Sequence, residues 1–380
     1  MSGLFGSGSS TTTQQASNTT GDISKDVTLN SPPEDGISEI TFSPQSEHLA
    51  VSSWDKKVRI YEINQQGGSE GKALFEHEGP VLSCCWSKVS HTLTTSYPQS
   101  LMLSKDGTKV VGAGADKAAR MLDLQNPGTP AQQVAAHEKE IRCARFVDVP
   151  GQQTPVLVTG SWDKTMKYWD LRQPNPVASI TCQERVYTMD SKDKMLVIGT
   201  ADRYVNIINL DKPGEFYKTM QSPLKWQTRV ISCFTDATGF AVGSIEGRCA
   251  IQYCEEKDAS SNFSFKCHRQ TPPNQSNVSN VYSVNAISFH PQHGTFSTAG
   301  SDGTFHFWDK DAKHRLKGYP EVGGTISSTA FSRTGDIFAY AVSYDWSKGY
   351  QANTPQLPNK VMLHAVQADE AKPRPKVGKR

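Results

Sequence analysis

Short apolar runs of strand length, separated by polar turns, recur along most of the chain. Residues 155–159 and 195–198 are two examples, each a nearly continuous apolar stretch bounded by turn-forming residues. Runs that are apolar on both faces are typical of strands covered by protein on both sides. The pattern predicts an all-β chain in which short strands are packed between neighbouring sheets.

A Trp-Asp ending repeats along these strands. The sharpest copies are residues 160–170 and 300–309, and each places a turn Asp shortly before an alternating strand that ends in Trp-Asp. A signature of this kind with a period of about 40 to 45 residues is typical of a β-propeller of the WD-repeat type. We therefore predict a WD-repeat propeller.

Seven units can be counted. Four have clear endings, at residues 53–61, 115–123, 160–170 and 300–309, and two keep the turn and strand but lose the Trp, at residues 199–209 and 243–253. The seventh has only three strands, at residues 326–331, 337–343 and 361–366. Propellers are commonly closed by the N-terminal segment, so residues 26–29 are expected to supply the missing outer strand. The prediction is a seven-bladed propeller over residues 26–367.

One unit contains the polar set that holds such blades together. His137, Ser161, Asp163 and Trp169 occupy the positions at which a His, a strand hydroxyl, a turn Asp and a Trp form a buried hydrogen-bonded set. A catalytic His/Asp pair is the alternative, but buried polar groups need partners for stability alone, and we interpret the set as structural. Phosphate-loop, HExxH and GxSxG motifs are missing, so we expect no enzyme.

Composition narrows the class further. The chain has 380 residues, 36% hydrophobic and 21% charged, which is ordinary for one globular domain with tails. The net charge of +2 gives no bulk attraction to nucleic acid. The eight cysteines show neither a disulfide framework nor zinc-ligand spacing and are expected to be reduced core residues. No signal peptide or membrane-spanning run is evident, which favours cytosol or nucleus.

Two tails and one internal segment depart from the repeat. Residues 1–25 are rich in Ser, Thr and Gly and are expected to be disordered, with a single Gly-Leu-Phe-Gly motif at residues 3–6. The tail at residues 368–380 is basic and is either solvated or in contact with RNA. Residues 88–104 look inserted, because Ser87-Lys88 recurs as Ser104-Lys105; they are interpreted as a surface loop or an error of the gene model.

Several longer stretches resemble one family. Residues 31–38, 243–248, 262–269, 307–312 and 344–349 are similar to the WD-repeat mRNA export factors that dock on a hairpin motif of the GLFG nucleoporin. The resemblance covers residues 26–375 and departs at 88–104 and after Ala312. It implies a non-enzymatic adaptor at the nuclear pore that shuttles to the cytoplasm and binds the nucleoporin and mRNA. It implies no cofactor, metal, small-molecule substrate or membrane insertion.

The resemblance also implies where partners bind. Basic residues gather beyond Trp308, and Phe265 lies one unit earlier; such mixtures are typical of sites for acidic peptides or single-stranded nucleic acid. The alternative is a core Trp308 with solvated lysines. The expected partner-binding residues are Arg248, Phe265, Lys266, Trp308, Lys310, Lys313, Arg315 and Lys317.

A second class of function stays open at this point. Residues 169–172 read Trp-Asp-Leu-Arg and match the WDxR ending of substrate receptors of cullin-RING ubiquitin ligases. The motif is short and occurs in many propellers. A pull-down of the ligase's adaptor subunit against one of the pore nucleoporin would distinguish the two functions.

Overall fold

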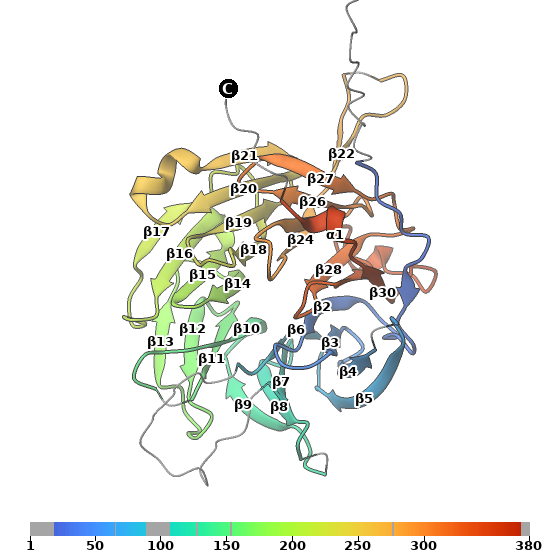
Figure 1. Ribbon diagram of the computed structural model, residues 1–380. Helices are drawn as coiled ribbons and strands as arrows, with labels where there is room; N and C mark the ends of the chain where they lie inside the picture. The colour runs from blue at the N-terminus through green and yellow to red at the C-terminus, as the bar shows by residue number, and fades with distance from the viewer. Residues whose placement is uncertain are drawn as a thin grey trace, which may run out of the picture.

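The computed structural model describes residues 19–64, 66–88, 107–126, 128–152, 154–275 and 277–373. These residues form seven antiparallel sheets of four strands each, arranged as a ring of blades around a central axis (Figure 1). In each of the first six blades the strands follow one another in chain order from the axis outward. The predicted seven-bladed propeller is therefore confirmed.

The strands of blades 1 to 3 come from the N-terminal half of the chain. Blade 1 consists of β2 (Ile37–Phe42), β3 (His48–Ser53), β4 (Lys57–Ile63) and β5 (Ser69–Glu76). Blade 2 consists of β6 (Val81–Trp86), β7 (Lys109–Gly114), β8 (Ala118–Asp123) and β9 (Gln132–Ala136). Blade 3 consists of β10 (Ile141–Val147), β11 (Val156–Ser161), β12 (Thr165–Trp169) and β13 (Ala178–Thr181).

Blades 4 to 6 continue the same order. Blade 4 contains β14 (Val186–Lys192), β15 (Met195–Thr200), β16 (Tyr204–Asn209) and β17 (Lys218–Gln221). Blade 5 contains β18 (Thr228–Cys233), β19 (Gly239–Ser244), β20 (Arg248–Tyr253) and β21 (Phe263–Lys266). Blade 6 contains β24 (Val284–Phe289), β25 (Phe296–Gly300), β26 (Phe305–Asp309) and β27 (His314–Gly318). Between blades 5 and 6, β22 (Arg269–Gln270) and β23 (Asn280–Val281) form a separate hairpin that projects from the ring (Figure 1).

Blade 7 joins the two ends of the chain. It contains β28 (Ile326–Phe331), β29 (Ile337–Val342) and β30 (Lys360–Ala365), and its outer strand is β1 (Val27–Thr28). Val27 pairs with Leu363 and Thr28 with Met362, which confirms the predicted closure. Contacts extend on both sides of residues 26–367: the N–H of Gly21 donates to the carbonyl of Gly318 at 2.9 Å, and the short helix α1 (Ala368–Ala371) buries its last two residues. The described residues also form three short 3-10 helices, which are η2 (Ala201–Arg203), η3 (Glu256–Ser261) and η4 (Tyr350–Ala352).

The core lies between the blades. Every residue of β11 and β15 is buried, as their apolar runs predicted. Val158 of blade 3 belongs to the same apolar cluster as Leu196 and Ile198 of blade 4, and similar clusters fill the other interfaces. Burying one such side chain stabilises the fold by about 1.5 to 3 kcal/mol. All eight cysteines are buried and unbridged, as expected. The part of the chain that the structure covers includes no helix with the length and hydrophobicity of a membrane span.

A bulge in each innermost strand aims one side chain at the axis. In all seven of these strands the register shifts after the first paired residue. The residues skipped by the pairing are Ser38, Leu82, Arg142, Tyr187, Arg229, Asn285 and Ser327, which we name the bulge ring. All of them except Leu82 line a central cavity of about 400 Å³. The bulges thus give seven equivalent positions, six of which line one cavity.

The flanks of the segment at residues 88–104 meet each other. Ser87 donates its backbone N–H to Lys109 at 2.9 Å, and its hydroxyl oxygen accepts the N–H of Gly107 at 3.0 Å. Residues 89–106 lie outside the described residues, so the predicted inserted loop lies almost entirely there. The same holds for the motif at residues 3–6 and for residues 374–380 of the basic tail.

Candidate partner-binding site

The polar set of blade 3 is built on one strand hydroxyl. His137 Nδ1 lies 2.9 Å from Asp163 Oδ2, and its Nε2 lies 2.7 Å from the hydroxyl of Thr159. The indole N–H of Trp169 donates to the same hydroxyl at 2.8 Å. Because burial disfavours the charged imidazole, the pKa of His137 is lowered. His137, Asp163 and Trp169 are therefore joined through Thr159 in one hydrogen-bonded set.

The prediction of Ser161 as the linking hydroxyl was wrong. Ser161 stands beside the turn, where its hydroxyl donates to the carbonyl of Lys139 and accepts the N–H of Asp163. Thr159 precedes it by two residues on β11 and pairs with Lys167 on β12. That position lies deeper in the blade, within reach of both His137 and Trp169.

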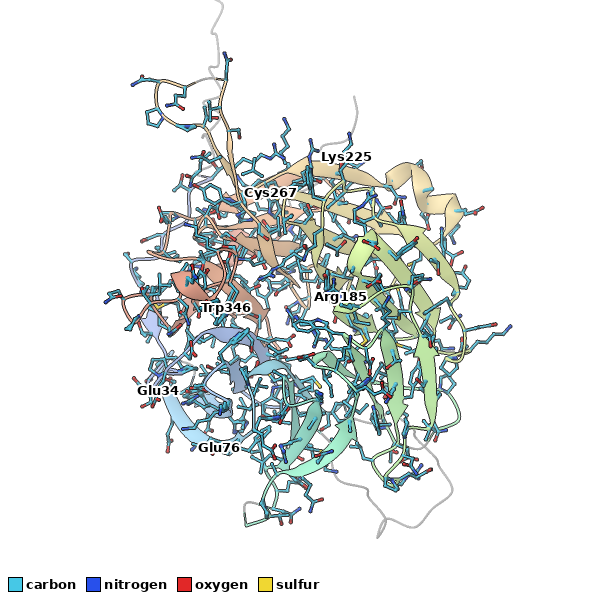
Figure 2. The ribbon with its side chains drawn as sticks, turned by 180° about the vertical axis from the view of Figure 1, so that it is seen from behind. Glu34, Glu76, Arg185, Lys225, Cys267 and Trp346 are labelled. Atoms are coloured by element: carbon cyan, nitrogen blue, oxygen red, sulfur yellow. The ribbon has the colours of Figure 1, made fainter. Side chains whose placement is uncertain are left out.

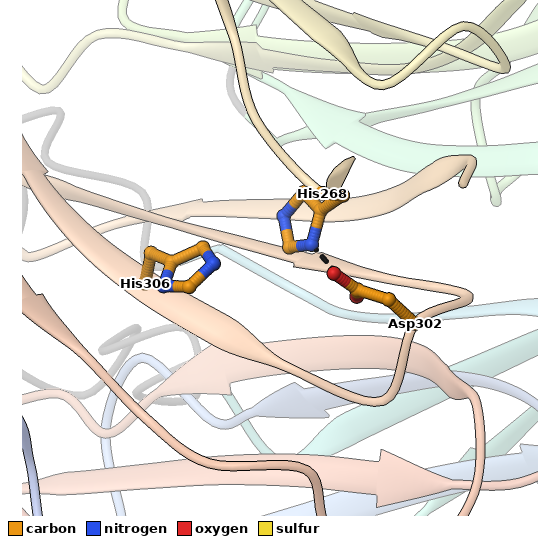
Figure 3. A group of neighbouring side chains, drawn as sticks. All are labelled: His268, Asp302 and His306. Carbon is orange, nitrogen blue, oxygen red and sulfur yellow. Dashed lines mark hydrogen bonds and ion pairs between the residues drawn. The ribbon is translucent and has the colours of Figure 1, made fainter. Parts of the chain in front are cut away.

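Blade 6 repeats this set with one additional histidine. His268 lies 2.9 Å from both Asp302 and the hydroxyl of Thr298, and Trp308 donates to Thr298 at 2.9 Å. His306 stands beside the pair, and ligand atoms of His268, Asp302 and His306 lie within 4.8 Å of one another (Figure 3). Both ring nitrogens of His268 are already engaged, so metal binding there would break the structural set. We interpret the group as part of the fold.

Three aromatic rings form a strip between blades 5 and 6. Phe263 and Phe265 lie on β21 with centroids 6.0 Å apart, and Phe265 lies 4.5 Å from Trp308 of β26. All three are partly exposed, although the indole N–H of Trp308 is bonded inside the blade. Trp308 thus belongs to the core on one side and offers an apolar edge on the other.

Two cations border these three aromatic rings. Lys313 Nζ lies 4.9 Å from the ring centroid of Phe263. Arg315 on β27 is exposed and pairs in register with Trp308. Within the described ranges, neither has a carboxylate within 4.0 Å. We use the name aromatic strip for Phe263, Phe265, Trp308, Lys313 and Arg315. The structure therefore brings together four of the eight predicted residues.

The other four predicted residues lie elsewhere. Arg248 and Lys266 are cross-strand partners, and Lys266 alternates with Phe265 along β21, so both side chains emerge from the opposite face of the sheet. Lys310 is an expected partner-binding residue, but it is only 7% exposed. Its Nζ lies 2.9 Å from Asp311. It also lies 5.0 Å from the ring centroid of Phe234, which follows β18 of blade 5 and helps to bury it. Lys317 lies 3.5 Å from Asp369 of α1.

Phe263 was missed as a site residue. It lies in the stretch that carried the resemblance, and the alternation of Phe263 and Phe265 on a strand places both rings on one face. That alternation is a signal the sequence does contain. The neighbouring contact with Lys313 depends on how blades 5 and 6 pack and has no local signal.

The fold and these polar sets define a WD-repeat β-propeller. The family description "WD domain, G-beta repeat" matches residues 26–62, 128–170 and 274–309. The chain is 62% identical to the mRNA export factor GLE2 of Chaetomium thermophilum over 100% of both chains. It is 57% identical to the Poly(A)+ RNA export protein of Schizosaccharomyces pombe over 99% of both, and 43% identical to Protein Rae1 of Drosophila melanogaster over 92% of this chain and 96% of that protein. The chain belongs to this family of WD-repeat mRNA export factors.

Proposed function

We propose that the chain is a non-enzymatic adaptor that links messenger ribonucleoprotein to the nuclear pore. In this proposal it docks on a hairpin motif of the GLFG nucleoporin through the aromatic strip, and it moves between nucleus and cytoplasm. The observation that carries the proposal is a run of three partly exposed aromatic rings bordered by Lys313 and Arg315. Apolar side chains of a peptide would cover the rings, and acidic ones would meet the cations.

The same strip suits single-stranded RNA as a second ligand. Bases stack on aromatic side chains with a contribution of about 1 to 3 kcal/mol each, and basic side chains neutralise phosphates. Phe263 and Phe265 lie on one strand face, so two adjacent rings are available. The relatives that are named as mRNA or poly(A)+ RNA export proteins support a role in this pathway.

The family assignment gives no support to a ubiquitin-ligase receptor. In addition, Arg172 of the WDxR ending is held by its own Asp170, with Nη2 2.6 Å from Oδ2 and Nε 2.8 Å from Oδ1. Its guanidinium therefore pairs with the Asp of its own motif in this structure.

Charge reversal at the strip tests the proposal. Binding of the nucleoporin hairpin and of oligo(A) RNA would be measured by fluorescence anisotropy for Lys313→Glu with Arg315→Glu, and for Phe265→Ala. Lys310 is left unchanged because it is buried. The matched control is Lys194→Glu with Lys212→Glu, two exposed lysines of blade 4. We expect the hairpin affinity to fall at least about tenfold, or 1.4 kcal/mol, in the strip variants and to persist in the control.

The two ligands are scored separately. Equal hairpin binding by strip variants and wild type at low salt would overturn the proposed docking site. Loss of the hairpin with full retention of RNA would move RNA to another surface, with the basic tail from Lys372 as the next segment to test.

A further inference from the structure

The bulge ring places two arginines at one end of the central cavity. Arg142 of blade 3 and Arg229 of blade 5 occupy equivalent positions, with Tyr187 of blade 4 between them. All three line the cavity of about 400 Å³. Arg185, one residue before β14, lies near the centre of the ring of blades in Figure 2. This end of the cavity is the one at which the innermost strands begin.

Neither arginine of the ring forms an ion pair with a carboxylate of the described residues. Arg142 donates to the carbonyl of Leu82 at 3.1 Å, and Arg229 donates to the carbonyl of Asp345 at 2.9 Å. No carboxylate lies within 4.0 Å of either guanidinium in the part of the chain that the structure describes. The carboxylate of Asp345 is occupied instead by Asn285, Ser301 and the N–H of Ser347.

A third arginine of the cavity, Arg145, is paired with carboxylates. Three residues further along β10, Arg145 lies 2.7 Å from Glu39 and 3.5 Å from Asp190. The fold therefore pairs one cavity arginine with two carboxylates, whereas Arg142 and Arg229 have no carboxylate within 4.0 Å among the described residues. Burial and the nearby charge of Arg142 lower the pKa of Arg229, and the charge of Asp345 offsets this lowering only in part. Both arginines are partly exposed, and two like charges that line one cavity without a paired carboxylate repel each other, so an anion in the cavity would relieve this repulsion.

Another polar group at this level has no hydrogen-bond partner in the described part of the chain. The hydroxyl of Ser327 is buried and makes no hydrogen bond among the described residues, and it belongs to the same bulge ring. A hydroxyl can donate to an anion, as can the phenol of Tyr187. The cavity thus combines two guanidinium groups with neutral donors at equivalent positions around one axis.

We propose that the bulge ring binds a small phosphate-bearing anion between Arg142 and Arg229. A phosphate group carries about 1.5 to 2 negative charges at pH 7, which matches two guanidinium groups. Guanidinium forks also hold phosphate oxygens through paired N–H donors. A lone carboxylate would neutralise only one of the two arginines. This site is separate from the aromatic strip, so it stands or falls independently of the function proposed above.

Titration with pyrophosphate and with inorganic phosphate tests the proposal. Calorimetry at low salt would be carried out on the full chain, on Arg142→Gln and on Arg229→Gln. Arg172→Gln is the control, because Arg172 is an exposed arginine of blade 3 outside the cavity. We expect saturable binding by the wild type and the control, and at least tenfold weaker binding by each cavity variant. If a variant fails to fold, phenylglyoxal labelling of the wild type should modify Arg142 and Arg229 less in the presence of pyrophosphate.

Three outcomes would overturn the proposal. One is no saturable binding by the wild type at millimolar pyrophosphate. Another is equal binding by all variants, which would indicate adventitious association with surface lysines. The third is binding of a glutamate-rich peptide but not of phosphate or pyrophosphate, weakened in the same way by Arg142→Gln and Arg229→Gln. That result would show that the bulge ring binds an acidic protein segment instead.

Discussion

His364 on β30 ties both ends of the chain to blade 7. Its Nδ1 lies 2.6 Å from the carboxylate of Asp26, next to β1, and its Nε2 lies 3.2 Å from the carboxylate of Glu370 in α1. The residue is only 4% exposed. Tyr340 also donates its hydroxyl to Asp26 at 2.7 Å. Replacing His364 should therefore weaken the closure of the ring in a way that depends on pH.

The size of the effect follows from the pKa of His364. Burial disfavours the imidazolium, but the hydrogen bonds and charges of Asp26 and Glu370 outweigh it and raise the pKa from 6.5 to about 9. Each pKa unit corresponds to about 1.4 kcal/mol, so the contacts of protonated His364 with Asp26 and Glu370 stabilise the fold by about 3 kcal/mol. Because the folded-state pKa is the higher one, this stability is fully present below pH 6.5 and is lost as the pH rises through 9.

Equilibrium urea unfolding at pH 6 and pH 9.5 measures this directly. Between these values, wild type should lose about 3 kcal/mol more free energy of unfolding than His364→Gln. His314→Gln is the control, since His314 has no carboxylate within 4.0 Å among the described residues, and its pH dependence should follow wild type. If the free energy of unfolding had the same pH dependence in wild type and in His364→Gln, the proposed role of His364 in closing the ring would be refuted.

Three further predictions concern the fold. Deleting residues 88–104 should leave the melting temperature nearly unchanged, because four residues, 105–108, would then link Ser87 to Lys109. Turns of the same length link Ser43 to His48 and Ser332 to Ile337; aggregation of the deletion variant would contradict this prediction. Removing the first 35 residues takes away β1 and the buried Leu29, whose burial alone contributes about 2 kcal/mol; a melting temperature equal to that of the intact chain would show that the closure is dispensable. Thr159→Val leaves His137 and Trp169 without their shared hydroxyl and should cost about 1 to 3 kcal/mol, measured by urea unfolding; a smaller loss than that of Ser161→Ala would reverse the assignment.

The architecture was predictable because its signals are local. The turn Asp, the alternating strand and the terminal Trp recur within short stretches such as residues 160–170. The closing strand followed from counting, since the seventh unit had three strands and propellers are commonly closed by the N-terminal segment, here residues 26–29. Strand boundaries differ by about one residue, as in β30, where Lys360–Ala365 replaces the predicted 361–366.

Details of the sites were not predictable because they depend on depth and on neighbouring blades. Thr159 and Ser161 are both hydroxyls on one strand face, and only their depth in the blade distinguishes them. Lys310 follows an Asp in a turn, which favours the surface, yet rings from blade 5 cover it. The bulge ring requires the strand register, which the sequence does not display.

The most direct measurement of the proposed function is the distribution of poly(A)+ RNA in cells that depend on this chain. The strip variant Lys313→Glu with Arg315→Glu would replace wild type, at matched protein level and after its melting temperature has been shown to be unchanged. In situ hybridisation with oligo(dT) should then show poly(A)+ RNA accumulating in the nucleus, and the variant should be lost from the nuclear rim, while Lys194→Glu with Lys212→Glu behaves as wild type. Normal RNA distribution and normal rim localisation in the strip variant would contradict the assignment of the aromatic strip as the docking site.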